Sequence, residues 1–148
     1  MAPLIALLLG TVAARIAGGA GVDYVGTWTK AVAVGLAAMF LLTGVAHFAP
    51  PLRAALIAIV PPQLPTPGLL VTVAGVLEFL GAVGLLVPST RVAAALCLLL
   101  LMLAMFPANI YAARMPNPPK SMTTQLPLRT AEEVIYLAAA IVVAIGGG

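Results

Sequence analysis

The sequence predicts an all-α membrane protein with five transmembrane helices, and three observations support this fold class. First, 63% of the 148 residues are hydrophobic and 7% are charged, with a mean hydropathy of +1.18, whereas soluble domains are roughly half apolar and about a quarter charged. Second, a chain of this length has too small an interior to bury so many apolar side chains. Third, the apolar residues fall into runs of about 20, the length that crosses a bilayer.

The first two apolar runs cover residues 2–22 and 30–49. The first contains a single charged residue, Arg15, whose long stem can reach the headgroups. Because no Lys or Arg precedes its apolar core, we expect this run to be a retained helix and not a cleaved signal peptide. The second run ends at Pro50 and Pro51, since proline does not suit the interior of a helix.

The apolar segment 52–60 is too short to cross a bilayer, so we expect an interfacial or re-entrant helix there. Residues 68–87 and 92–112 are predicted to form an antiparallel hairpin, because the tight turn "PSTR" joins them. Inside the second of these spans, Pro107 removes a backbone hydrogen bond and predicts a break in the helix.

The last predicted span covers residues 130–146 and completes a single membrane domain, 1–148. It begins with Glu132 and Glu133, so we expect its first turn to lie in the headgroups.

Positive charges are distributed unequally between the two predicted membrane faces. The loops on the side of the N-terminus contain Arg53, Arg114, Lys120 and Arg129, and the opposite loops contain Lys30 and Arg91. Because cytoplasmic loops carry an excess of Lys and Arg, we expect a multi-pass protein of the inner (plasma) membrane with a cytoplasmic N-terminus. Trp28, Arg91 and Arg114 are expected to lie at the membrane interfaces as anchors.

Several functional classes do not fit the composition. The net charge of +3 comes from scattered residues and forms no basic stripe, which argues against nucleic-acid binding. Cys97 is the only cysteine, so an intrachain disulfide or a CxxC redox pair is excluded. A single histidine without clustered ligands does not predict a metal site.

Glu78 is the one acid well inside an apolar span, "GVLEFLGAVGLL". It lies ten residues after Gly68, which places it roughly 15 Å deep in a hydrocarbon core about 30 Å thick. A bare carboxylate at that depth is costly. We therefore expect Glu78 either to face a polar cavity, with a functional or structural role, or to be a neutral acid hydrogen-bonded between helices.

His47 lies in "LLTGVAHFAPP", where the second helix leaves the membrane, and Thr43 shares its helix face. Two interpretations remain open: an interfacial histidine that donates to a carbonyl, or a binding residue in a pocket with Glu78 and Asn109. Asn109 lies near the end of the fourth span, on the same predicted side as His47. The candidate ligand-binding residues are therefore Thr43, His47, Glu78 and Asn109, in a pocket open to one membrane face.

Three segments, "GVAHF" followed by proline, "GVLEFLGAVGLLVPSTR" and "FPANIYAA", resemble the DoxX-like membrane proteins. The resemblance covers about residues 30 to 145 and implies a four-helix membrane bundle, so residues 2–22 would form an additional N-terminal helix. Some relatives resemble membrane subunits of thiosulfate:quinone oxidoreductases, and an actinobacterial branch is linked with oxidant defence. The resemblance maps the recurring polar positions of the family onto His47, Glu78, Arg91, Pro107 and Asn109.

The favoured function is a redox-linked membrane subunit that binds a quinone or docks a partner oxidoreductase. His47 or Asn109 would donate to a quinone carbonyl, with Glu78 as a proton partner. No self-contained catalytic constellation or intrinsic cofactor is predicted, so the chain would be at most one subunit of an oxidoreductase complex. The alternatives are a structural or accessory subunit of a larger membrane assembly, and a small lipid-binding or solute-binding module.

Overall fold

The computed structural model describes residues 1–147, and every regular element within that range is a helix. The elements, in chain order, are α1 (Ala2–Gly19), η1 (Asp23–Val25), α2 (Trp28–Ala46), α3 (Pro50–Ala58), α4 (Pro67–Leu86), α5 (Arg91–Arg114), η2 (Lys120–Met122) and α6 (Leu126–Gly146). Each predicted span and the short interfacial segment are helical over nearly the expected residues.

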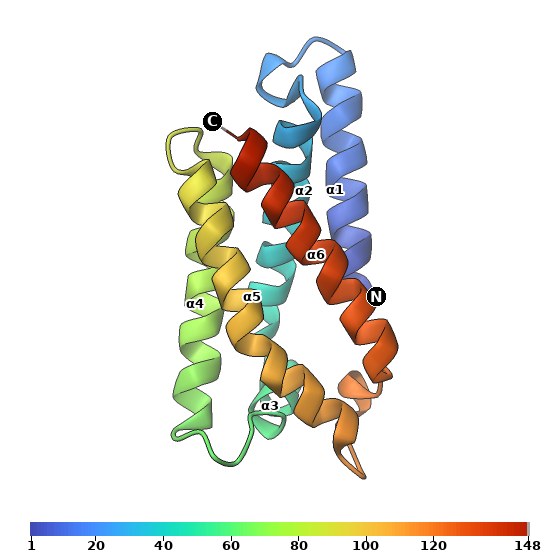
Figure 1. The fold of residues 1–148 in the computed structure, drawn as a ribbon, viewed down its shortest axis with the longest axis vertical. Coiled ribbons are helices and arrows are strands. Elements are labelled where there is room, and N and C mark those ends of the chain that lie inside the picture. The colour runs from blue at the N-terminus through green and yellow to red at the C-terminus, as the bar shows by residue number, and fades with distance from the viewer. Residues whose placement is uncertain (148) are drawn as a thin grey trace.

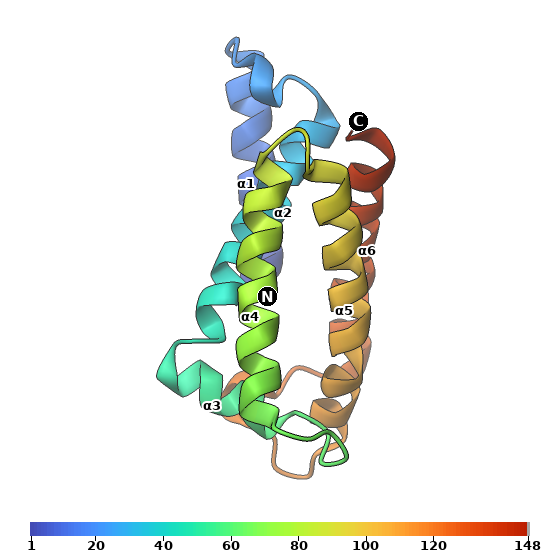
Figure 2. The same cartoon turned by 90° about the vertical axis from the view of Figure 1, so that its left-hand side faces the viewer.

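Four long helices form a closed bundle, in which α2 packs on α4, α4 on α5, α5 on α6 and α6 on α2 (Figures 1 and 2). Their buried side chains meet in one core, to which Leu36, Leu85, Leu98 and Val143 each contribute from a different helix. None of these four side chains is more than 2% exposed.

Helix α1 lies outside this bundle and packs against α2 (Figure 1). The two backbones approach closely at Gly10 and Gly35, where a Cβ atom on Gly35 would lie 2.5 Å from the Leu7 carbonyl oxygen. Such small-residue contacts are typical of helices that associate in a membrane. The other face of α1 exposes large apolar side chains, among them Leu9 and Ile16.

Four helices, α1, α2, α4 and α5, are long and apolar enough to cross a membrane. This finding supports a membrane protein. Helix α6 is also long, with 21 residues, but its first two turns contain Arg129, Glu132 and Glu133. That it crosses the membrane as the fifth span stays a prediction.

Prolines mark the beginnings of helices more than their breaks. Pro50 and Pro51 occupy the first positions of α3, where the missing N–H would have no partner within the helix. Pro107 behaves differently from the expectation, because α5 continues through it from Arg91 to Arg114. The predicted helix break at Pro107 is therefore wrong: the proline removes one backbone bond, but the flanking turns keep the helix together.

Candidate functional site

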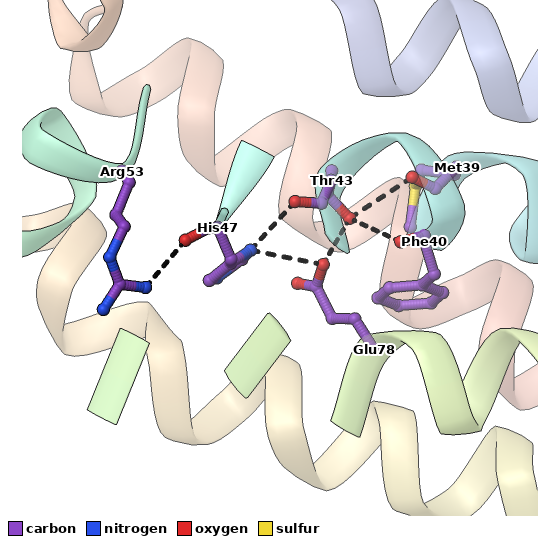
Figure 3. A network of polar contacts seen from close by, with 6 residues as sticks. All are labelled: Met39, Phe40, Thr43, His47, Arg53 and Glu78. Carbon is purple, nitrogen blue, oxygen red and sulfur yellow. Dashed lines mark hydrogen bonds and ion pairs between the residues drawn. The ribbon is translucent and has the colours of Figure 1, made fainter. Parts of the chain in front are cut away.

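The site begins with two residues one turn apart at the end of α2 and one residue of α4 that faces them (Figure 3). The Thr43 hydroxyl donates to Glu78 Oε2 at 2.6 Å. The His47 ring nitrogen Nδ1 lies 2.8 Å from the Thr43 carbonyl oxygen and 3.6 Å from Glu78 Oε2. Glu78 is 4% exposed and His47 is 3% exposed, so both side chains depend on partners within the protein.

The contact with Thr43 decides which nitrogen of His47 carries the proton in the neutral ring. A carbonyl oxygen can only accept, so Nδ1 must be the donor. The other ring nitrogen, Nε2, is then left with a lone pair and can accept a hydrogen bond. His47 thus donates to a carbonyl, as the first interpretation expects, and presents an acceptor on its other edge.

Small residues of α4 make room for this arrangement. A Cβ atom on Gly75 would lie 2.6 Å from His47 Cβ and 2.7 Å from Phe48 Cε2, closer than real Cβ contacts. Phe48 in turn stacks on Phe79 with ring centroids 5.9 Å apart, and Gly44 faces the Phe79 ring. The end of α2 therefore rests directly on the backbone of α4.

Arg53 of α3 connects this cluster to the first turns of α4. Its Nη1 donates to the His47 carbonyl oxygen at 2.9 Å (Figure 3). Its Nη2 donates to the Gly68 carbonyl oxygen at 3.0 Å and to Thr72 Oγ1 at 2.9 Å. The sequence analysis counted Arg53 only among the positive charges of the loops and missed this role. The one hint in the sequence is that Arg53 lies three residues after Pro50, in the short segment that follows the second span.

Asn109 of α5 is held by a second arginine that sequence reasoning also missed. Arg129 Nη1 donates to Asn109 Oδ1 at 3.1 Å. The same guanidinium donates from Nε to the Thr124 carbonyl oxygen at 2.9 Å and from Nη2 to the Met122 carbonyl oxygen at 2.7 Å. Since Oδ1 accepts from Arg129, the amide group of Asn109 remains as a donor.

All four residues selected from the sequence, Thr43, His47, Glu78 and Asn109, line one cavity of about 440 Å³. Ligand pockets have volumes of roughly 300–1,000 Å³ and combine apolar walls with a few polar groups. The apolar wall here includes Met39, Phe40, Leu56, Ile59, Met102 and Met105. The structure thus brings the four residues together, and that they bind a ligand stays a prediction.

Helix α6 adds a second group of polar side chains to the same cavity: Arg129, Glu132, Glu133 and Tyr136. Glu132 Oε1 lies 2.9 Å from the Met1 amino group. The sequence analysis expected the two glutamates in the headgroups and left them, and Tyr136, out of the pocket. Tyr136 lies four residues after Glu132 and three after Glu133, so it shares a helix face with both. This spacing could have indicated that Glu133 and Tyr136 belong to the pocket.

The three residues predicted to lie at the membrane interfaces, Trp28, Arg91 and Arg114, do not line the cavity. Trp28 is 66% exposed and carries the Arg15 guanidinium 4.8 Å from its ring centroid. Arg114 is exposed at the end of α5. Arg91, however, is 3% exposed and donates to the Leu85 carbonyl oxygen at 3.0 Å and to the Tyr24 hydroxyl at 3.3 Å. The guanidinium of Arg91 is thus enclosed by the protein, and that this residue lies at the membrane interface stays a prediction.

Within residues 1–147, no three His, Cys, Asp or Glu residues group as potential metal ligands. Residues 36–144 match the family model described as "Domain of unknown function (DUF8561)". The matched segment begins within α2 and ends within the last turn of α6. No curated protein and no solved structure matches the chain. On the match over most of its length, the chain belongs to the DUF8561 family.

Proposed function

We propose that this protein is a DoxX-like, redox-linked membrane subunit that binds a quinone in its cavity and docks a partner oxidoreductase. The observation that carries the proposal is the cavity of about 440 Å³, because it combines an apolar wall with a few converging polar groups. A quinone likewise combines a polar part, the ring with its two carbonyl groups, with an apolar tail. The match of shape and chemistry supports this ligand class.

The polar groups of the cavity are oriented by the rest of the protein. Arg129 holds the oxygen of the Asn109 amide, so the amide nitrogen is free to donate to a carbonyl of the ring. His47 has committed its proton to the Thr43 carbonyl, so it serves as an acceptor and not as the donor that the sequence suggested. Glu78, held by Thr43, is a group that can exchange a proton with the ligand.

Electrons would enter from a redox centre of the partner oxidoreductase, and the chain itself would bind and orient the ring. Support for the DoxX-like assignment comes from the arrangement of α2, α4, α5 and α6 as a bundle with α1 outside it, which is the architecture that the resemblance implies. Three of the recurring positions, His47, Glu78 and Asn109, also line the cavity.

The proposal is tested by binding, with the full-length protein in lipid nanodiscs and decylubiquinone as the probe. Saturable binding is expected, and Asn109→Leu should weaken it by about tenfold, the cost of one lost hydrogen bond to a buried polar group. Asn117→Leu is the matched control, because Asn117 is exposed and lies outside the cavity. Absence of saturable binding to the wild-type protein, together with no quinone in solvent extracts of protein purified from its native membrane, would contradict the proposal.

A structural or accessory subunit is the second candidate, and one observation favours it. Hydrogen bonds within the protein join α2, α3 and α4 without any ligand, and they involve Thr43, His47, Arg53 and Glu78. If His47→Gln with Glu78→Gln keeps both assembly and quinone binding, the cluster is structural. The cavity also suits a lipid or small solute, and native mass spectrometry with bound phospholipid in place of quinone would favour that binding module.

A further inference from the structure

The exposed part of the cavity wall differs from its interior. Some of the lining residues are also exposed, and all of these but the serine are apolar: Met1, Ala2, Leu42, Leu52 and Ser121. The polar side chains of the same cavity, among them His47, Glu78 and Asn109, are buried or half-buried. A residue that lines a cavity and is also exposed lies at its opening. The opening is therefore mainly apolar, and the polar side chains lie behind it.

The first residues of α1 and the last turns of α2 form one side of this opening. The two helices meet at Gly10 and Gly35, since a Cβ atom on Gly10 would lie 2.9 Å from Gly35 Cα. They run in opposite directions (Figure 1), so the positions seven residues away from this contact, Pro3 and Leu42, lie at one level. Leu42 is nevertheless 45% exposed, so α1 leaves this part of α2 uncovered.

The amino group of Met1 is the charged group at this side of the opening. It lies 2.9 Å from Glu132 Oε1 of α6, so it is paired with a carboxyl group of the cavity wall and does not make the opening polar.

Helix α3 forms the other side of the opening through Leu52, which is 39% exposed. Leu52 lines the cavity and also a second hollow between α3 and η2, which contains Ser121 as well. Helix α1 packs mainly on α2, whereas α3 packs on α4 and η2. Within residues 1–147, no extensive helix contact therefore closes the side between α1 and α3.

The segment before α6 covers the cavity toward the predicted membrane face. Met122 and Thr124 of this segment line the cavity, and Arg129 donates to their carbonyl oxygens at 2.7 Å and 2.9 Å. The same guanidinium donates to Asn109 of α5, which ties the segment to the bundle. A ligand that came from the aqueous phase through this segment would have to break these hydrogen bonds.

We infer that the cavity opens sideways into the lipid, between the beginning of α1 and α3, and that its ligand is a long-tailed membrane quinone whose tail stays in this opening. This inference rests on the proposed function and deepens it by naming the tail and its path. Leu42 belongs to a helix that is long and apolar enough to cross a membrane. In such helices polar groups face the interior of the bundle and exposed apolar side chains face lipid. The ring thus reaches the polar groups past Leu42 and Leu52, without leaving an apolar environment.

The direct test uses a ubiquinone analogue that carries a diazirine at the end of a decyl tail, bound to the full-length wild-type protein in lipid nanodiscs. After irradiation, the adducts are located by mass spectrometry, with and without excess decylubiquinone as competitor. We expect the adducts that are lost on competition to lie in residues 1–5, 41–46 and 50–56, because these segments flank the opening.

A second test examines the lipid side of the opening without a ligand. Trp28 is the only tryptophan, so in a Trp28→Phe background Leu42→Trp gives a fluorescence signal from position 42 alone. Phospholipids brominated on their acyl chains should remove most of this signal. Asn117→Trp in the same background is the matched control, because Asn117 is exposed, lies in the polar loop after α5 and is outside the cavity. Its fluorescence should change little.

The negative results have different meanings. Competed adducts that lie only in residues 115–125 would show that the tail leaves toward the aqueous face, and weak quenching at position 42, equal to that of the control, would show that the opening does not face lipid. Either result overturns the inference and leaves quinone binding intact. Absence of any competed adduct overturns the proposed function itself. Because the crosslinking uses the wild-type protein, it stays decisive even if Leu42→Trp does not fold.

Discussion

At the scale of single residues, the hydrogen bond from Thr43 to Glu78 joins α2 to α4 at 2.6 Å, next to a buried carboxylate. Thr43→Val should cost about 1–3 kcal/mol of stability, because Glu78 then loses its donor while it remains buried. A double-mutant cycle with Glu78→Leu, measured by detergent unfolding, should give a coupling energy of about 1 kcal/mol, within the range of interhelical hydrogen bonds in membranes.

Thr123→Val is the control for this cycle, since Thr123 is exposed and its hydroxyl contacts only the Lys120 carbonyl. A coupling energy of zero between Thr43 and Glu78 would show that the bond contributes nothing to the association of the two helices.

The sequence predicted that four residues line one pocket, because helix rise gives the depth of each residue and topology gives the side on which it lies: Thr43, His47, Glu78 and Asn109. It did not predict the roles of Arg53 and Arg129. Both arginines donate chiefly to backbone carbonyl oxygens, and the positions of those oxygens depend on loop paths that carry no periodic pattern. Charge counting therefore assigned these residues to topology alone.

At the scale of elements, the contact between α2 and α4 depends on the absence of a side chain at Gly75. Gly75→Ala should destabilise the protein by about 1–3 kcal/mol, because its Cβ would overlap His47 Cβ and force the helices apart. Gly19→Ala is a matched control within a helix, since nothing lies within 4 Å of the position that its added methyl group would occupy. It should be neutral or slightly stabilising, as alanine favours helices by up to about 1 kcal/mol.

Unfolding of both variants in the same detergent checks this prediction. Equal stability of Gly75→Ala and Gly19→Ala would show that the close approach seen between α2 and α4 is not required.

Helix α3 is tied to the bundle by the hydrogen bonds of Arg53 and by buried apolar side chains, Ala55 and Ile59. Arg53→Met keeps much of the apolar stem but removes the donors to His47, Gly68 and Thr72, so α3 should open more easily. We expect faster amide hydrogen exchange in residues 50–58 by about tenfold or more, since each lost bond to a charged group is worth about 1.5–3 kcal/mol.

Arg114→Met serves as the control for α3, because Arg114 is exposed at the end of α5. Unchanged exchange in α3 after Arg53→Met would assign its attachment to the apolar contacts of Ala55 and Ile59.

The spans were predictable as elements because apolar runs and flanking prolines set their limits. The predicted span 92–112 includes Pro107, but the break expected at that residue is absent, since a lost backbone bond does not by itself end a helix whose other bonds remain. The burial of Glu133 could not be predicted either. The sequence shows acids in the first turns of α6, but whether one of them is buried depends on how α6 packs in the fold.

At the scale of the whole molecule, the family match begins at residue 36, so α1 lies outside the matched segment. Met1, Ala2 and Pro3, at the beginning of α1, nevertheless form part of the cavity wall, and the Met1 amino group lies 2.9 Å from Glu132 Oε1 of α6. The cavity is thus built by the family's bundle and completed by a helix outside the matched segment.

The orientation of the bundle is the last prediction, and the two ends of α5 provide the test. Ser89 precedes α5 and Ser121 follows it, both are exposed, and the loops that contain them lie at opposite ends of the molecule (Figure 1). In a Cys97→Ala background, Ser121→Cys should react with a membrane-impermeant maleimide only in inverted vesicles, and Ser89→Cys only in right-side-out vesicles, because the face with more Lys and Arg stays cytoplasmic. The reverse pattern would contradict the orientation, and labelling of both positions from one side would contradict a crossing by α5.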